Sequence, residues 1–175
     1  MSDCDLTYFG KYRGTVLNNI DPMQMGRIQA VVPDVSNLVP TSWAMPCLPL
    51  AGPQMGIFMV PPVGAGVWIE FEQGDPDFPI WVGCFTGTAA DVPGPARAVP
   101  PAVSGITLQT TAQNGIAISD APGPQGGIVI RSRTGATIIV DDTGIYIRNG
   151  KGASIEMTGK TVRINQDALV IDPVP

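Results

Sequence analysis

The chain has 175 residues, a formal net charge of −5 at pH 7, 44% hydrophobic residues and only 6% aromatic residues. It contains no apolar run of about 18 residues, and its start carries neither a basic nor an apolar stretch, so we expect no membrane-spanning helix and no secretion signal. The acidic balance argues against nucleic-acid binding, because affinity for phosphates comes largely from Lys and Arg.

Composition and charge both suggest two modules. The chain is rich in turn-forming residues, with 21 Gly and 18 Pro, which favours a small domain joined to an elongated part over one large globular core. Residues 1–104 hold four basic and nine acidic residues, a net charge of −5, whereas residues 105–175 hold six of each. The acidic character therefore belongs to the first module.

The first module contains short apolar segments separated by Gly, Pro and Asp, a pattern typical of β-strands. Residues 12–18 (YRGTVLN) and 26–32 (GRIQAVV) flank a turn at residues 19–22 and are predicted to form an antiparallel pair. Pro33 and Asp34 then end the second strand.

The strict alternation in residues 66–72 (GVWIEFE) predicts a strand with one buried face and one solvated face. A Gly-Asp-Pro-Asp turn follows at residues 74–77, and residues 79–85 (PIWVGCF) return as the partner strand. Several such strands within residues 1–92 indicate a small closed β-barrel.

The order of these motifs resembles the OB-fold domain of phage baseplate spike proteins and of the VgrG-like spikes of contractile injection systems. The resemblance rests on YRGTVLNNIDPMQMGRIQAVVPDV at residues 12–35 and on WAMPCLPLAGPQMGIFMVPPVGAGVWIEFEQGDPDFPIWVGCF at residues 43–85. A Pro-Pro-x-Gly entry, the alternating strand, the Gly-Asp-Pro-Asp turn and a Pro-Ile-Trp-x-Gly return occur there in order. The resemblance implies an OB-fold barrel over residues 1–92.

A proline-rich linker at residues 93–105 separates the two modules, and its prolines predict an extended spacer without regular pairing. In some spikes of the resembled family a lysozyme domain sits between barrel and stem. A segment of about 15 residues is far too short for such a domain. The resemblance therefore implies no muramidase activity here.

The second module, residues 106–175, repeats apolar pairs whose members lie two positions apart, as on one face of a strand. Turn residues such as Asn114-Gly115 and Asn149-Gly150 separate the pairs. The pattern predicts eight short strands, each with one apolar face. The pairs begin at Ile106, Ile116, Ile128, Ile138, Ile145, Ile155, Val162 and Leu169.

One copy of this module cannot easily bury its apolar face, so we expect further copies of the chain to cover it. Three copies around a common axis would point the apolar pairs inward. The pattern resembles the trimeric β-helix that follows the OB domain in the same spike family, so an intertwined homotrimeric stem is expected. Its predicted core residues are Ile116, Ile118, Ile128, Ile130, Ile138, Val140, Ile145, Ile147, Ile155, Val162 and Ile164.

No catalytic, cofactor or metal site is predicted. Asp142-Thr143-Gly144 matches the triplet of dimeric aspartic proteases, but it falls where the repeat requires a turn. Glu70 and Glu72 could be imagined as an acid and a base, although a solvated strand face explains them better. The chain has no histidine and only three widely separated cysteines, which we expect to be free thiols, with one disulfide as the alternative.

The end of the chain, ALVIDPVP, lacks the His-x-His motif whose three copies bind iron at the point of some spikes in the resembled family. That iron site is therefore not carried over. The apolar residues Leu169, Ile171 and Val174 form instead a candidate docking site for a separate tip protein of the PAAR-repeat type, with fraying of the terminus as the alternative.

The residues and the resemblance together predict a structural protein without enzymatic activity, the central spike of a contractile tail or of a related injection system. The resemblance implies a spike that lies in the virion tail baseplate and is assembled in the bacterial cytoplasm. Such a spike docks on a hub protein and contacts the target membrane transiently as it pierces it. Two alternatives stay open, an OB-fold module that binds a glycan or nucleic acid and a cell-wall hydrolase.

Overall fold

The computed structural model describes residues 7–123, 126–166 and 168–171, and the chain divides into two compact units, residues 1–89 and 90–175. Strands dominate both units, so the all-β fold expected from the sequence is confirmed. The helical segments of the described residues are short, namely α1 (Pro33–Ser36), η1 (Glu72–Gly74), η2 (Ala89–Asp91) and α2 (Gly94–Ala98).

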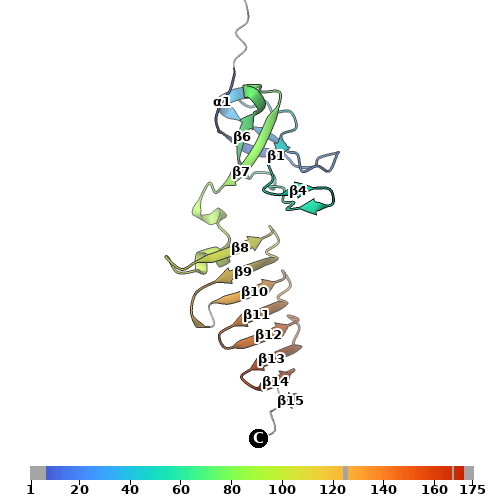
Figure 1. The fold of residues 1–175 in the computed structure, drawn as a ribbon, viewed down its shortest axis with the longest axis vertical. Helices are drawn as coiled ribbons and strands as arrows, with labels where there is room; N and C mark the ends of the chain where they lie inside the picture. The colour runs from blue at the N-terminus through green and yellow to red at the C-terminus, as the bar shows by residue number, and fades with distance from the viewer. Residues whose placement is uncertain (1–6, 124–125, 167, 172–175) are drawn as a thin grey trace, which may run out of the picture. The chain divides into compact units, whose positions relative to one another are not determined.

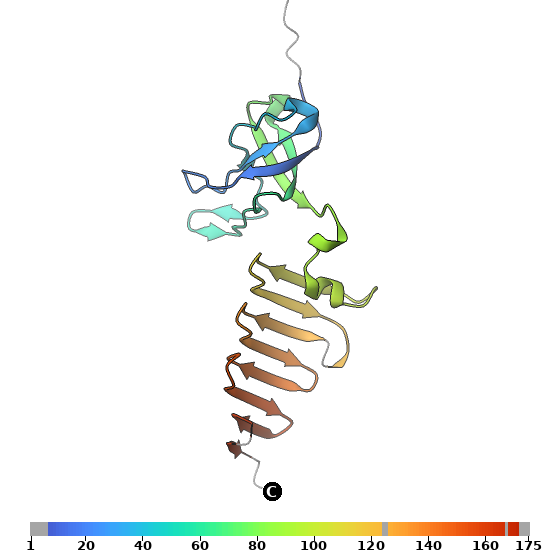
Figure 2. The same ribbon diagram turned by 180° about the vertical axis from the view of Figure 1, so that it is seen from behind.

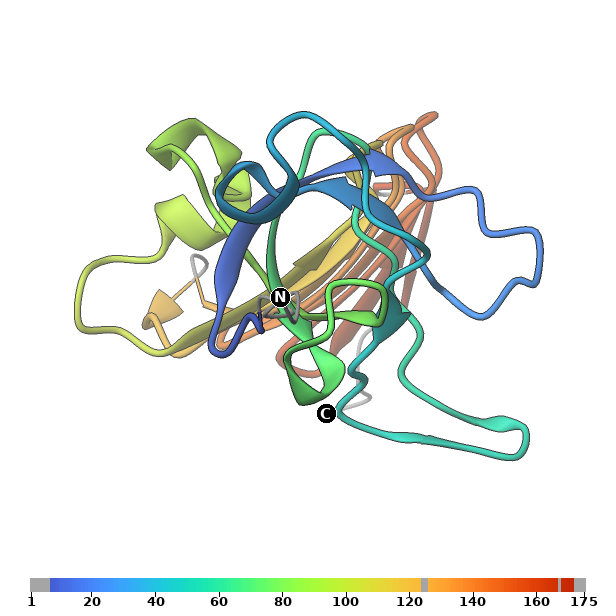
Figure 3. The same ribbon diagram turned by 90° about the horizontal axis from the view of Figure 1, so that it is seen from above.

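The first unit contains a small barrel whose five strands form one curled sheet (Figure 3). Its order is β2-β1-β6-β7-β3, for strands β1 (Tyr12–Asn18), β2 (Gln29–Val31), β3 (Met45–Pro46), β6 (Gly66–Phe71) and β7 (Pro79–Phe85). The segment around β3 brings the two ends of the sheet together, because β3 pairs in parallel with β7 while Ala44 forms an antiparallel bridge with Ile28, next to β2. Closure of this kind removes free sheet edges.

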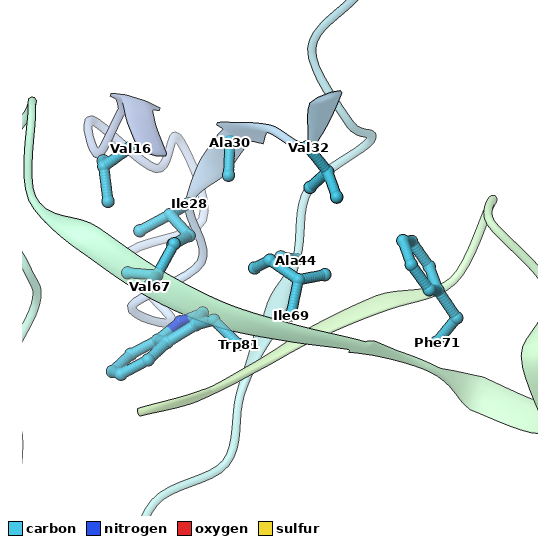
Figure 4. Packing of buried hydrophobic residues seen from close by; sticks show 9 residues of the cluster. All are labelled: Val16, Ile28, Ala30, Val32, Ala44, Val67, Ile69, Phe71 and Trp81. Atoms are coloured by element: carbon cyan, nitrogen blue, oxygen red, sulfur yellow. The ribbon is translucent and has the colours of Figure 1, made fainter. Parts of the chain in front are cut away.

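The core of the barrel follows the alternation predicted for residues 66–72. Val67, Ile69 and Phe71 are buried, whereas Trp68 between them is half-exposed. The core cluster consists of Val16, Ile28, Ala30, Val32, Ala44, Val67, Ile69, Phe71 and Trp81 (Figure 4). The barrel therefore encloses a hydrophobic core within a single chain.

The connection between β1 and β2 is longer than the four-residue turn expected at residues 19–22, and a buried carboxylate organises it. Asp21 accepts hydrogen bonds from the backbone N–H groups of Met23 at 3.0 Å and Met25 at 2.8 Å, and its Oδ1 lies 2.6 Å from a guanidinium nitrogen of Arg27. The hydrogen bond from Arg27 holds the pKa of Asp21 well below its usual range. The loop is thus held in one conformation from within.

A small hairpin projects from the barrel between β3 and β6 (Figure 2). Its strands, β4 (Ala51–Gly52) and β5 (Met55–Gly56), pair with each other and with no other strand. A hydrogen bond from the Ile57 N–H to the Leu50 carbonyl, 3.0 Å long, continues the pairing toward the barrel.

The linker differs from the extended spacer that its prolines predict. Residues Gly94–Ala98 form the short helix α2, and the N–H of Arg97 donates to the carbonyl of Pro93 at 3.2 Å. Prolines are tolerated here because the N–H groups of a first helical turn have no partner within the helix. The helix packs against β8 of the second unit, so the extended conformation predicted for this segment is wrong.

The second unit carries the eight predicted strands, which pair in chain order as one antiparallel ladder (Figure 1). We call this ladder the stem. Every interior strand is paired on both sides within the same chain. The strands are β8 (Gly105–Gln109), β9 (Gly115–Ser119), β10 (Gly127–Arg131), β11 (Thr137–Asp141), β12 (Gly144–Arg148), β13 (Ser154–Thr158), β14 (Thr161–Ile164) and β15 (Leu169–Ile171).

Candidate functional site

The apolar pairs of the stem line up across all eight strands in two unbroken columns. Each pair on one strand stands opposite the pair on the next strand, and side chains opposed in this way contact each other directly. We call the two columns together the apolar face. One column is Ile106, Ile118, Ile128, Val140, Ile145, Met157 and Val162, whose backbone pairs with Ile171, and the other is Leu108, Ile116, Ile130, Ile138, Ile147, Ile155, Ile164 and Leu169.

The single chain leaves this face open to solvent. Twelve of its side chains are between 36% (Ile145) and 60% (Ile106) exposed. Among the described residues of the second unit, the only buried hydrophobic residue is Ala121, which lies in the loop between β9 and β10. A soluble protein rarely exposes so long an apolar surface unless it is an interaction surface.

The opposite face of the sheet changes character along the stem. Its middle is apolar, with Val129 beside Ile139, but further on Glu156 stands opposite Arg163. Glu156 also forms an ion pair with Arg148, 3.0 Å between Oε1 and the guanidinium nitrogen. Only the apolar face is therefore uncharged over all eight strands and suited to form the core of the stem.

The residues predicted for a shared core all lie on the apolar face. Leu169, predicted for tip docking, lies there too and is half-exposed. Ile171, the second predicted tip residue, belongs to β15, and Val174, the third, lies outside the described residues. The core residues placed on this face are Ile116, Ile118, Ile128, Ile130, Ile138, Val140, Ile145, Ile147, Ile155, Val162 and Ile164.

Sequence reasoning missed that the glycines at the start of three stem strands, Gly115, Gly127 and Gly144, are needed for close approach of two backbones as well as for turns. A Cβ added at Gly127 would lie 2.0 Å from the carbonyl oxygen of Val140, and one added at Gly144 would lie 2.2 Å from that of Met157. No side chain fits at either distance. The sequence does mark these strand starts with a repeated motif, Gly-Ile-x-Ile or Gly-Ile-x-Leu, which begins at residues 105, 115, 127 and 144.

Polar side chains connect neighbouring turns along both sides of the ladder. The Asn114 Oδ1 in the β8–β9 turn accepts from the N–H of Arg133 in the β10–β11 turn at 2.8 Å. On the other side, the Asp142 Oδ2 accepts from the N–H of Gly123 at 3.0 Å. Each bond joins turns that are two strands apart, so it resists bending of the ladder as well as sliding of one strand.

The Asp142-Thr143-Gly144 triplet is part of a turn. Its preceding neighbour, Asp141, accepts hydrogen bonds from the Thr143 hydroxyl at 2.5 Å, from the Thr143 N–H at 2.7 Å and from the Gly144 N–H at 3.1 Å. The hydrogen bond from the Thr143 hydroxyl is the main cause that lowers the pKa of Asp141. The Asp141 carboxylate thus works as a turn cap, which supports the structural interpretation of this motif.

The outer surface of the barrel carries a cation stacked on two aromatic rings. The guanidinium carbon of Arg13 lies 5.4 Å from the centroid of the Trp68 ring and 5.3 Å from that of Phe85. The two rings are themselves 5.1 Å apart between centroids. Gly66 leaves room for this arrangement, because a Cβ there would lie 2.6 Å from the Phe85 ring. Arg13 therefore covers the rings on which a base or a sugar would stack.

The described residues contain no cluster of three or more His, Cys, Asp or Glu side chains that could hold a metal ion. Cys47 and Cys84 are free thiols, and partial burial raises the pKa of Cys84; Cys4 lies outside the described residues. Within the same described ranges, no helix is long and apolar enough to cross a membrane.

Comparison with known proteins assigns both parts of the chain. Residues 12–85 match the family model of the type VI secretion system and phage-baseplate injector OB domain. Residues 105–170 match the family model of the phage baseplate V C-terminal trimerisation domain. A search of curated proteins finds no match to the chain. The two models cover the barrel and the ladder in the same order as the structure has them.

Proposed function

This chain belongs to the phage baseplate V family of spike proteins, and on that premise we propose that three copies form a needle that pierces the target cell envelope. Both matched families are parts of the tail baseplate, so we locate this chain in the baseplate. The needle would be the stem of three copies, with the apolar faces turned toward one another. In this proposal the chain acts mechanically and has no catalytic role.

One observation carries the proposal, the apolar face that is continuous over eight strands and open to solvent in the single chain. Burial of an aliphatic side chain contributes roughly 1.5–3 kcal/mol from full exposure, and about half of that for a side chain already half-covered. Repeated along the whole stem of every copy, this gain is large enough to drive association. The match of residues 105–170 to a trimerisation domain supports three as the number of copies.

The mechanical role rests on how the stem resists deformation. Ile side chains have few rotamers in a strand, so a core made mostly of Ile is stiff. The turns are tied to one another, as by Asn114 to Arg133 and by Asp142 to Gly123. Contraction elsewhere in the tail would supply the force, and the stem would transmit it along its axis.

Partners follow from this role. The barrel would seat the spike on a separate hub protein, and the end near β15, with Leu169 and Ile171, would receive a tip protein of the PAAR-repeat type. Val174 belongs to the same predicted tip site. The spike would be assembled with the baseplate in the bacterial cytoplasm and would meet the target membrane only transiently, when the tail contracts.

The mass of the purified full-length chain tests the assembly, because light scattering distinguishes a trimer from a monomer. Two neighbouring residues of β11 give a matched pair of variants, since Ile138 lies on the apolar face and Ile139 on the opposite face. Ile138→Asp places three carboxylates in an apolar core and should abolish the trimer. Ile139→Asp introduces the same group outside that core and should leave a trimer.

A monomeric wild-type chain would contradict the trimer itself. A trimer that survives Ile138→Asp but not Ile139→Asp would show that the wrong face was assigned to the core. Piercing needs its own measurement. Production of tails with the Ile138→Asp chain should yield fewer assembled baseplates. The tails that do form should fail to breach target cells. Intact, active particles containing this variant would contradict the needle.

A further inference from the structure

Residues 35–69 contain no Asp, Glu, Lys or Arg, although residues 1–89 as a whole hold three basic and eight acidic residues, a net charge of −5. Within this charge-free stretch, every residue from Pro49 to Met59 is exposed. We call residues 49–59 the arm. It contains the β4–β5 hairpin that projects from the barrel (Figure 2). An acidic barrel thus presents one projecting segment that carries no charge.

The arm is apolar as well as uncharged. Its hairpin pairs only two residues on each strand, and an isolated hairpin is marginal in water even when it is longer. Its large side chains lie open to solvent: Leu50 is 48% exposed, Ile57 44%, Met59 57%, Met55 60% and Phe58 64%. A segment of this kind gains stability when another apolar surface covers it, and the flexible thioethers of methionine adapt readily to such a surface.

The arm is anchored beside a second exposed apolar segment, the loop between β1 and β2. The Asn19 side-chain amide donates to the carbonyl of Pro61 at 3.0 Å, just beyond the arm. The Phe58 ring packs over Gly26, where an added Cβ would lie 3.0 Å from the ring. Figure 3 shows that the loop and the arm project on the same side of the barrel.

The loop adds its own apolar side chains to this surface, with Ile20 82%, Met23 64% and Met25 42% exposed. Asp21 and Arg27 hold the loop from within, so the backbone that presents these side chains loses little conformational entropy on binding. The arm and residues 20–25 of the loop form one preorganised apolar patch.

We infer that this patch packs against the barrel of a second copy of the chain, and this inference rests on the trimer proposed above. In a trimer the three barrels are tethered to one stem, which raises their effective concentration toward each other. Each barrel carries a net charge of −5, so barrels that approach one another repel. The arm carries no charge and the Asp21 carboxylate of the loop is paired with Arg27, so contact through the patch brings few like charges together, and it removes several large exposed apolar side chains of the barrel from water.

A photo-crosslinking amino acid at Met55 of the full-length chain tests the contact. The matched control places the same amino acid at Phe78, which is also 60% exposed and lies on the barrel outside the patch. Irradiation of the purified trimer should give covalent dimers and trimers from the Met55 position, several-fold above the yield from the Phe78 position. Light scattering on the same samples reports separately whether the trimer is present.

The two measurements separate the possible failures. A trimer without adducts between copies at Met55 overturns the inference and leaves the stem trimer standing, and so do equal yields from both positions. A monomer overturns the trimer and the barrel contact together. Adducts from Met55 alone support the inference.

A pair of charge variants provides a second test that does not depend on crosslinking chemistry. Met55→Glu adds a negative charge to the patch, whereas Phe78→Glu adds the same charge elsewhere on the barrel. We expect Met55→Glu to preserve the trimer mass but to increase the hydrodynamic radius and the rate at which a protease cuts the arm. Equal behaviour of the two variants would overturn the inference.

Discussion

The barrel has a core cluster of nine buried apolar side chains, whereas the only buried hydrophobic residue among the described residues of the second unit is Ala121. Yet both regions are built from short strands with one apolar face. The barrel sheet curls until its ends meet, so each strand faces others across a core. The stem strands follow one another in an open ladder, and twelve side chains of their apolar face are exposed. The same alternation thus produces a buried core in one case and an exposed apolar face in the other.

Unfolding of the barrel can be measured separately from assembly of the stem, because the three tryptophans, Trp43, Trp68 and Trp81, all lie in the first unit. Tryptophan fluorescence therefore reports unfolding of the barrel alone. Light scattering reports the assembly that depends on the stem. The predictions below use these two signals, from the largest expected effect to the smallest.

Ile130→Asp should have the largest effect, complete loss of the trimer. The side chain lies in the middle of the apolar face, opposite Ile116 and Ile138, and three copies would bring three carboxylates into one apolar core. The fluorescence transition of the barrel should change little. Light scattering and fluorescence on the same sample check both points. A trimeric, heat-resistant variant would contradict the inward orientation of the face.

Ile69→Ala should have the converse effect. Ile69 is fully buried in the barrel, and removal of its side chain should lower the free energy of unfolding by about 2–5 kcal/mol. The trimer mass should not change, because this side chain takes no part in the apolar face. Denaturant titration followed by tryptophan fluorescence measures the loss. Dissociation of the trimer in this variant would mean that the barrel and the stem are not independent.

Gly144→Ala should weaken the stem by an intermediate amount. Its Cβ would meet the Met157 carbonyl oxygen, so β12 and β13 must separate locally, at a cost of about 1–3 kcal/mol per chain. Gly83→Ala is the control, because Gly83 is a barrel strand glycine with no atom within 4 Å of an added Cβ. Circular dichroism melting should show a lower transition for the first variant. A similar loss in the control would point to a general intolerance of strand glycines.

Acid should destabilise the barrel through Asp21. Because the pKa of Asp21 is lowered in the folded chain, its ionised form contributes stability that is present above about pH 4, the ordinary pKa of Asp, and is lost as the pH falls through the lowered value. The fluorescence transition should therefore fall below about pH 4. Asp21→Asn should be less stable at neutral pH and should lose less on acidification. Parallel pH profiles for both proteins would contradict the role of this carboxylate.

Arg13→Ala should have the smallest effect, a loss of about 0.5–1 kcal/mol from the barrel, because stacking of an exposed cation on aromatic rings contributes about that much. Trimer mass and stem melting should be unchanged. Denaturant titration by fluorescence measures the difference, with Thr15→Ala on the same strand face as the control. A loss in the control as large as in the variant would assign the effect to the strand instead of to the stack.

The strands of both regions were predictable where alternation is strict. Residues 66–72 show directly which side chains face the core, and the apolar pairs of the stem show which side chains share one face, because side chains of a strand alternate with a period of two. The helix α2 was not predictable in the same way. The linker prolines suggested an extended chain, but Pro93 directly precedes, and Pro95 occupies, the first turn of a helix that packs on β8.

Contacts between residues that are far apart in the sequence could not be predicted from the local sequence pattern. Arg13 stacks on Phe85, and Asn19 bonds to the carbonyl of Pro61 next to the arm. Neither contact leaves a periodic trace in the sequence, because each depends on how the barrel closes. The strand-starting glycines did leave a repeated motif, but only the ladder explains it by the close approach of a neighbouring carbonyl, as at Gly127.

The sequence by itself determined two modules, the strands of each and the apolar face of the stem, because composition and period-two alternation act locally. Tertiary structure alone decided that the barrel closes on itself while the ladder stays open, and that the arm lies beside the β1–β2 loop. The physical reason is that closure depends on pairings between residues distant in the chain, such as Ala44 with Ile28, which local preferences do not specify.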